Sequence, residues 1–169
     1  MKKIILILFS FILFTQVDGQ TSIAKAQAMF IYNFSRLISW PSEYQTGDFV
    51  IGILGTSNIE SELEGYCATK KVGFQNIIIK SFKNPEDLTK CHILFVSYGK
   101  TSKMAEILSS IQGKSTLIIA EKRGAIDDGA AINFIIGEDR LKFELKVGNA
   151  SKYGLKISSK LQEMAIMVN

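Results

Sequence analysis

The chain has 169 residues, of which 20 are Lys or Arg and 16 are Asp or Glu, giving a formal charge of +4. This length suits one domain with a sizeable core and gives no reason to expect a second. The positive charge is mild and forms no Lys/Arg block, which argues against a nucleic-acid partner. One His and two Cys are too few for a structural zinc site.

The first segment, MKKIILILFSFILFTQVDGQT, joins Lys2 and Lys3 to a short apolar run and a small residue, Gly19. This pattern predicts a secretory signal peptide over residues 1–19, because a membrane-spanning helix needs about 20 apolar residues. No cysteine stands at the predicted cleavage site, which argues against a lipoprotein. The domain, residues 20–169, is therefore expected in the periplasm or outside the cell.

Residues 22–40 are predicted to form a helix that Pro41 closes. Its apolar stripe, at helical spacing, consists of Ile23, Ala26, Phe30, Phe34, Leu37 and Ile38. The opposite side and its border are polar and aromatic, and they carry Met29, Tyr32, Arg36 and Trp40. These four are candidates for contact with a partner protein, and packing against the last helix explains them equally well.

Short apolar strands then alternate with helices. Strands are predicted at residues 49–55, 72–82, 92–98 and 115–121, helices at 57–66 and 102–113, and one helical turn at 84–90. Such alternation is typical of a mostly parallel sheet with helices on both faces. The sequence therefore predicts a single three-layer α/β domain.

The pattern changes near the C-terminus. The stretch AAINFIIGEDRLKFELKV (130–147) has two strand-like runs around a GEDR turn, which predicts a β-hairpin. NASKYG reads as a short helical turn that Gly154 stops. A last helix follows, in which Ser159 and Gln162 have capping-box spacing. Its apolar stripe consists of Leu161, Met164, Ala165 and Val168.

The stretch CHILFVSYGKTS (91–102) raises the question of a phosphate site. A P-loop needs a glycine five residues before its Gly-Lys-Thr, and that position is Leu94. Gly99-Lys100-Thr101 is therefore interpreted as a strand-to-helix turn. A helix that begins after Gly55 leaves backbone N–H groups free to hold an anion. Candidate residues for a ligand crevice there are Gly55, Thr56, Ser57, Ser97 and Lys100.

No catalytic arrangement emerges from the chemistry-bearing residues. His92 begins a buried strand, whereas chemistry in open α/β sheets gathers at the carboxyl ends, so a structural role is favoured. No Gly-x-Ser-x-Gly elbow offers a nucleophile. The carboxylate clusters (Asp127 with Asp128, Glu138 with Asp139, and Glu60, Glu62 and Glu64) read as turn and helix-surface chemistry. The sequence thus predicts a binding or regulatory protein with no cofactor and no metal.

Cys67 and Cys91 form an even pair in an expected oxidising compartment. This predicts a disulfide between them, worth about 3–4 kcal/mol in the chain-entropy description.

Three stretches together resemble one known family. KAQAMFIYNFSRLISWP (25–41), CHILFVS (91–97) and INFIIGEDRLKFELKVGNASKYGLKISSKLQEMA (132–165) occur in the order and spacing of the YfiR family of periplasmic regulators. The resemblance implies a Rossmann-like α/β domain, often dimeric, without established catalytic activity. It implies repression of an inner-membrane diguanylate cyclase through the cyclase's periplasmic part, relieved by an OmpA/Pal-like outer-membrane lipoprotein.

Through that resemblance, the protein is expected to limit cyclic-di-GMP output, exopolysaccharide and biofilm formation. Other family members accompany sensor histidine kinases, which leaves a small-ligand-binding module as the alternative. The segment 154–160, which begins with the family motif GLKISS (154–159), adds Gly154, Lys156 and Lys160 to the candidate partner contacts. The chain has two cysteines where the best-known repressor has two disulfide pairs, and Cys91 matches the family's Cys-His position.

Overall fold

The computed structural model describes residues 17–137 and 140–169. Its helices are α1 (Val17–Leu37), α2 (Ile59–Cys67), α3 (Met104–Ser110), α4 (Val147–Ser151) and α5 (Ser159–Met164), with short 3-10 helices η1 (Ser42–Tyr44), η2 (Pro85–Asp87) and η3 (Tyr98–Lys103). Its strands are β1 (Ile38–Ser39), β2 (Phe49–Leu54), β3 (Lys71–Val72), β4 (Gln75–Phe82), β5 (Ile93–Val96), β6 (Leu117–Ala120), β7 (Ile132–Ile136), β8 (Leu141–Leu145), β9 (Lys156–Ile157) and β10 (Ile166–Met167).

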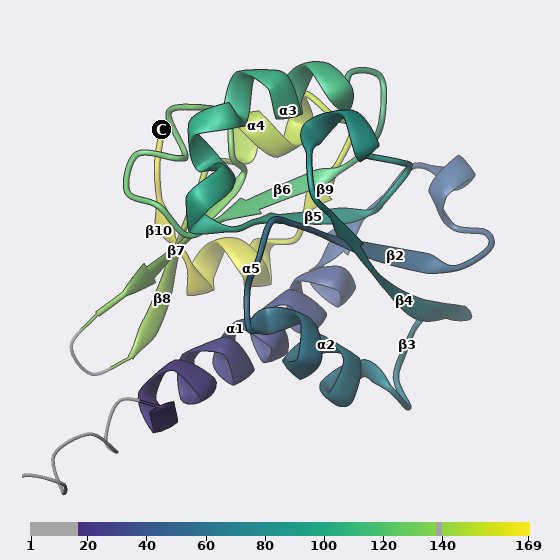
Figure 1. The fold of residues 1–169 in the computed structure, drawn as a ribbon. Helices are drawn as coiled ribbons and strands as arrows, with labels where there is room; N and C mark the ends of the chain where they lie inside the picture. Colours follow the sequence, from purple (N-terminus) through teal and green to yellow (C-terminus); the bar gives the residue numbers. More distant parts are fainter. Residues whose placement is uncertain (1–16, 138–139) are drawn as a thin grey trace, which may run out of the picture.

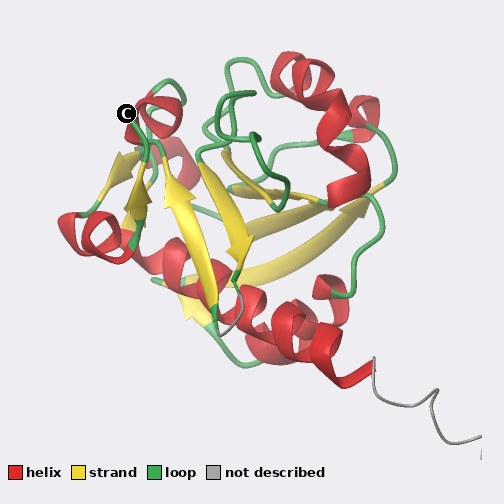
Figure 2. Ribbon diagram, turned by 90° about the vertical axis from the view of Figure 1, so that its left-hand side faces the viewer, coloured by secondary structure: helices red, strands yellow, loops and turns green. Residues whose placement is uncertain are grey.

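Within this described part, one eight-stranded sheet has the order β10-β8-β7-β6-β5-β2-β4-β3. The strands from β7 to β4 in that order run parallel, while β8 is antiparallel to β7 and β3 is antiparallel to β4. Helices lie on both sides of the sheet (Figures 1 and 2). The predicted α/β fold, with its mostly parallel sheet, C-terminal hairpin and following helix, is confirmed.

The sheet separates two hydrophobic clusters. The larger contains residues of α1, α2 and α5 and is rich in aromatic side chains, with Phe34 packed against Phe134 and Phe143. The smaller contains residues of α3, such as Met104 and Ile107, and is mainly aliphatic. We call these two sides the α1 face and the α3 face. Alternating residues of each buried strand supply them in turn.

Several elements differ from the sequence-based prediction. The buried side of α1 is centred on Ala24, Ala28 and Ile31, whereas Phe30, placed in the predicted stripe, is only half-buried. The helix also ends at Leu37, because Ile38 and Ser39 form β1 and pair with β9. The predicted strand 72–82 is instead the hairpin β3–β4, since Gly73 takes a positive φ of 58° at its turn.

The C-terminal helix is shorter than predicted. The N-cap of α5 is Ser158, whose side chain accepts the Leu161 N–H, so the predicted cap at Ser159 was one residue late. The helix stops at Met164, and β10 then pairs with β8. Leu161 is fully buried, but Met164 of the predicted apolar stripe is exposed.

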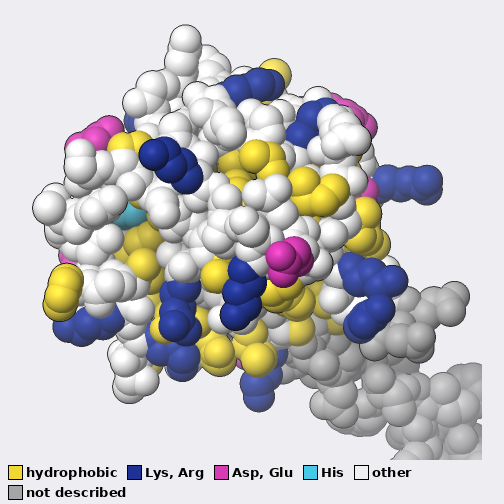
Figure 3. Space-filling view, turned by 180° about the vertical axis from the view of Figure 1, so that it is seen from behind, with side chains coloured by type: hydrophobic (Ala, Val, Ile, Leu, Met, Phe, Trp, Pro, Cys, Tyr) yellow, Lys and Arg dark blue, Asp and Glu magenta, His cyan; other side chains and the backbone are white. Residues whose placement is uncertain are grey.

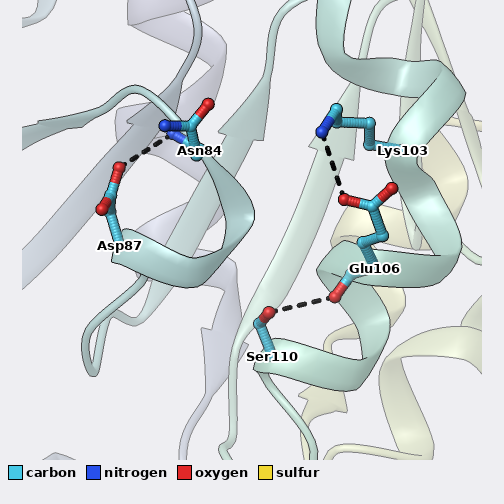
Figure 4. Close-up of polar contacts among 5 residues, drawn as sticks. All are labelled: Asn84, Asp87, Lys103, Glu106 and Ser110. Atoms are coloured by element: carbon cyan, nitrogen blue, oxygen red, sulfur yellow. Dashed lines mark hydrogen bonds and ion pairs between the residues drawn. The ribbon is translucent and has the colours of Figure 1, made fainter.

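Surface contacts on the α3 face are local caps (Figure 4). Asp87 accepts the Asn84 backbone N–H at 3.1 Å at the start of η2. Lys103 and Glu106 form an ion pair at 3.2 Å, and the Ser110 hydroxyl donates to the Glu106 carbonyl oxygen. These contacts hold the short helices η2 and α3 together.

Residues 1–16 of the predicted signal peptide, and the Glu138–Asp139 pair, lie outside the described residues. The predicted cleavage position between Gly19 and Gln20 falls in the first turns of α1. Within the described residues, no helix combines the length and the apolar character that crossing a membrane requires.

Candidate partner-binding surface

His92 lies at the centre of an aromatic cluster on the α1 face. It is buried and its ring stacks on Phe49 at 4.2 Å, with Trp40 and Tyr44 edge-on at 5.9 and 5.3 Å. Its Nδ1 accepts the Val50 N–H at 3.0 Å, and its Nε2 donates to the Tyr44 carbonyl oxygen at 2.7 Å. Because both ring nitrogens are bonded to backbone, the structural role predicted for His92 is confirmed.

Those two hydrogen bonds require a neutral imidazole, with one nitrogen accepting and the other donating. Burial lowers the pKa of His92, partly opposed by the hydrogen bond to Tyr44, and nearby Lys90 lowers the pKa further. Through these two hydrogen bonds, the neutral His92 side chain, just before β5, links η1 to the start of β2.

A hollow of about 410 Å³ opens over this cluster. It is visible in Figure 3, where the cyan histidine atoms show inside it. The end of α1, β1, η1 and the β3–β4 hairpin enclose it. Its lining consists of Ser35, Arg36, Ile38, Ser39, Trp40, Tyr44, Gln45, Phe49, Val72, Gly73, Phe74, Gln75 and His92.

Phe74 stands at the rim of the hollow and is fully exposed. The hairpin that carries it is held in place, because the Gln75 side-chain amide donates to the carbonyl oxygens of Tyr44 and Thr46. A large apolar side chain that meets only water, on an anchored turn, is typical of a contact residue for another molecule. Phe74 was not among the predicted contacts, because residues 72–82 were predicted as one strand, although Gly73 within that run is a signal for a turn.

Arg36, near the end of α1, also lines this hollow and is exposed. Next to it, cations and tyrosines alternate along α1 and α2. The Arg36 guanidinium lies 5.9 Å from the Tyr32 ring centre, and Lys70 Nζ lies 4.0 Å from that of Tyr66. Tyr32 and Tyr66 meet edge to face at 5.8 Å. The surface beside Arg36 is thus positively charged and aromatic.

The predicted contacts on the first helix have different surroundings. Met29 and Arg36 are exposed and Tyr32 is half-buried. Trp40 is buried, and its indole N–H donates to the His92 carbonyl oxygen at 3.2 Å. A partner can therefore reach Trp40 only through the hollow, not on the surface of α1.

The second predicted group lies beside the first. Ser39 of β1 pairs with Lys156 of β9, so the motif 154–159 and the end of α1 meet through backbone. Lys156 and Lys160 are exposed, and Gly154 has a φ of 72° in the turn before β9. The alternative explanation, packing between the first and last segments, holds for Ile38 and Ile157, while the two lysines face solvent.

The residues of the predicted ligand crevice lie close together, but the side chains of Ser97 and Lys100 fill the space beside Gly55. Gly55 follows β2 and Ser97 follows β5, and the Ser97 N–H donates to the Leu54 carbonyl oxygen. The Lys100 side chain lies against Gly55, in the space where a Cβ would stand. Thr56 is exposed and Ser57 is half-buried. Gly99, Lys100 and Thr101 belong to η3, which confirms that they form the strand-to-helix turn.

Cys67 and Cys91 are both buried and both free. Cys67 belongs to the cluster on the α1 face and Cys91 to the cluster on the α3 face, so the sheet lies between their thiols. The predicted disulfide is therefore absent from the structure. Burial raises the pKa of both thiols, that of Cys91 to about 11.

Among the residues that the structure describes, no three His, Cys, Asp or Glu side chains are grouped as a metal site. Every buried side-chain nitrogen and oxygen in this part of the chain has a hydrogen-bond partner. The polar groups of the interior are thus used in holding the fold.

A family model described as YfiR/HmsC-like matches residues 24–166. This match covers α1 from Ala24 onward, the strands from β1 to β9 and the first residue of β10. Among curated proteins, none matches the sequence significantly.

Two solved structures share the fold. One is the ABC domain in complex with L-Trp from Streptococcus pneumonia, with a TM-score of 0.59 at 12% identity, covering 87% of this chain and 62% of that one. The other is a conserved domain protein from Vibrio cholerae O1 biovar El Tor, with a TM-score of 0.58 at 8% identity, covering 86% and 60%. The chain thus spans about three-fifths of either structure, and at these identities the likeness concerns the fold alone.

Proposed function

Because this chain belongs to the YfiR/HmsC-like family, we propose that it is a periplasmic regulator that binds and represses an inner-membrane diguanylate cyclase. Repression lowers cyclic-di-GMP and so limits exopolysaccharide and biofilm formation. Residues 1–19 direct export, and an OmpA/Pal-like outer-membrane lipoprotein competes for the regulator. The protein acts as a homodimer, by contact rather than by catalysis. The family match is the observation that carries this proposal.

The hollow and its rim are the surface that we assign to the cyclase. Exposed aromatic and arginine side chains dominate binding energy at protein interfaces, and Phe74 and Arg36 both line one concave site. The aromatic floor offers an apolar core for an interface, and Lys70 adds positive charge nearby. The expected partner element is therefore an apolar side chain or short segment flanked by acidic residues.

The experiment is in-cell crosslinking of the tagged, exported protein, with identification of the captured membrane proteins and measurement of cyclic-di-GMP. We expect capture of a diguanylate cyclase and higher cyclic-di-GMP when the regulator is deleted. Phe74→Ser should reduce capture at least about tenfold, as interface hot spots do. Ile136→Ser, at an exposed apolar residue on β7, is the matched control and should capture normally. A deletion that leaves cyclic-di-GMP unchanged would refute the proposed output.

The alternative is a small-ligand-binding module that serves a sensor histidine kinase. The volume of the hollow favours it, because small-molecule sites typically span about 300–1,000 Å³. Thermal shift against nucleotides, cell-wall fragments and amino acids tests it, with L-Trp included because the similar ABC domain is in complex with it. A saturable rise in melting temperature that Phe49→Ala removes would favour this alternative.

A further inference from the structure

A second hollow, of about 490 Å³, lies beside the start of β6. Three segments converge there: the chain after β1, the turn after α3 and the turn after α4. They approach closely, because a Cβ added at Gly154 would lie 3.5 Å from the Pro41 Cγ and 3.7 Å from the Ser115 Oγ. This hollow shares no lining residue with the hollow over His92. It is therefore a separate site, which the proposed function does not use.

Positive charge predominates around this second hollow. Among the described residues that line it, Lys114 and Lys152 are the cations and Glu43 is the only carboxylate. Lys90 adds a further cation nearby, since its Nζ donates to the Glu43 carbonyl oxygen at 2.9 Å. Three ammonium groups therefore attract an anion, against one exposed carboxylate that repels it. The charge balance favours an anionic ligand.

Both lysines of the lining are held in place by the fold. Lys114 Nζ donates to the Ser110 carbonyl oxygen at 2.8 Å, and Lys152 Nζ lies 3.4 Å from Asn149 Oδ1. Asn149 is itself buried, and its side-chain amide donates to two backbone carbonyl oxygens. Because an ammonium group has three N–H donors, each lysine uses one of them and offers two to a ligand. A ligand thus meets charges that are already positioned.

Uncharged donors complete the lining. The Tyr153 and Ser115 hydroxyls and the Gln112 side-chain amide make no hydrogen bond with any described residue. Since every buried polar side-chain atom in this part of the chain has a partner, these three groups are open to solvent or to a ligand. Burial raises the pKa of Tyr153, so its hydroxyl stays protonated at neutral pH and can donate. The Ser115 backbone is fixed, because its N–H donates to the Tyr44 hydroxyl oxygen at 2.9 Å.

We propose that this second hollow binds a small organic phosphate monoester, whose phosphate lies between Lys114 and Lys152. A phosphate ester carries a charge of about −2 and three strong acceptor oxygens, which suits two ammonium groups and several neutral donors better than a carboxylate does. Lysine is a common phosphate ligand in proteins. Leu108 and Pro41 add an apolar wall, which suits an organic body rather than free phosphate. The volume also lies in the range of small-molecule sites, about 300–1,000 Å³.

Thermal unfolding of the exported protein tests the ligand class. The probes are glycerol 3-phosphate and adenosine 5′-monophosphate, each compared with its unphosphorylated parent, glycerol or adenosine. We expect a phosphate ester to raise the melting temperature saturably, by at least about 3 °C, while neither parent raises it. Inorganic phosphate should give a smaller rise, because it does not reach the apolar wall. Failure of both esters, or equal rises with the parents, would overturn the proposal.

Paired substitutions locate the site. Lys114→Gln with Lys152→Gln removes both charges from the lining and should weaken binding of the ester at least about tenfold. Lys80→Gln with Lys83→Gln is the matched control, because it removes the same charge at two exposed positions outside the lining. The control pair should bind as the wild type does. Equal weakening in both pairs would show general attraction of anions to a basic protein and would overturn the assignment to this hollow.

Tyr153→Phe is a milder variant that keeps the ring and removes only the hydroxyl. It covers the case in which the lysine pair fails to fold, since Lys114 caps the last turn of α3. It should weaken binding of the ester about two- to tenfold and leave the melting temperature of the free protein nearly unchanged. Phe74→Ser, at the hollow over His92, should bind the ester normally. Loss of binding in Phe74→Ser but not in Tyr153→Phe would place the ester in that other hollow and overturn the inference, whatever the result of cyclase capture.

Discussion

The two faces of the sheet are covered in different ways. The α3 face is aliphatic, and its surface contacts are local caps and one ion pair between Lys103 and Glu106. The α1 face is aromatic, and at one end its cluster opens into a hollow edged by Phe74 and Arg36. Aromatic side chains supply large contact areas both inside the core and at interfaces. The proposed recognition surface thus lies where aromatic side chains of the α1 face reach the solvent.

The largest effect on stability should come from the buried aromatic cluster of the α1 face, away from the hollow. Phe34 is fully buried and packs against Phe30, Phe134 and Phe143, with ring centres 4.9–6.1 Å apart. Phe34→Ala should lower the free energy of unfolding by about 3–5 kcal/mol, the usual cost of a phenylalanine cavity. Denaturant unfolding followed by circular dichroism measures it. The control Phe74→Ala should change stability by less than about 0.5 kcal/mol, since surface substitutions rarely do more.

A loss below about 1 kcal/mol for Phe34→Ala would show that the aromatic cluster is loosely packed. The α1 face would then owe its aromatic content to recognition alone. If Phe34→Ala and Phe74→Ala lowered the free energy of unfolding equally, Phe74 would contribute to the stability of the fold as much as the buried cluster does.

The sequence predicted the fold well where the periodicity was simple. The apolar runs of β2, β5 and β6 and the hairpin of β7 and β8 were recognised because each stands between clear turn residues. The buried side of α1 was not, because Ala24 and Ala28 are small and carry little weight in an apolar pattern. Their size matters only once a sheet packs closely against them, which is a property of the tertiary structure.

The candidate site was predicted in part. Tyr32 and Arg36 were identified from their position on the polar side of a helix, and both lie at or near the hollow. Phe74 was missed, since a phenylalanine in an apolar run gives no sign that it stands on a turn. The hollow itself joins α1, η1, β2 and the β3–β4 hairpin, which lie apart in sequence, so no local pattern could reveal it.

A smaller effect should come from His92, at the floor of the open end. Because its pKa in the folded protein is lowered from 6.5, the unfolded chain takes up the proton first as the pH falls. The stabilisation is therefore complete above pH 6.5 and is lost below it, by at most about 1.4 kcal/mol per pH unit. Unfolding measured from pH 7.5 to 5 should show this loss in the wild type.

His92→Gln is the comparison, because glutamine can donate and accept hydrogen bonds but does not titrate. Its unfolding free energy should be lower at pH 7.5 and should fall less steeply toward pH 5. Subtracting the two curves removes the contribution of the carboxylates that both proteins share. Parallel curves would mean that His92 has the same pKa in the folded and the unfolded chain, as it would if water reached the floor of the hollow.

The smallest effect should be that of a reductant. Cys67 lies in the cluster of the α1 face and Cys91 in that of the α3 face, so the sheet keeps the two thiols apart. Reductant should leave the melting temperature unchanged, and unfolding without reductant should release two titratable thiols per chain. In the folded protein both should react slowly, Cys91 most of all, because burial raises its pKa to about 11 and suppresses the reactive thiolate. A chain with no free thiol, destabilised by reductant by about 3–4 kcal/mol, would restore the disulfide and require the two faces to rearrange.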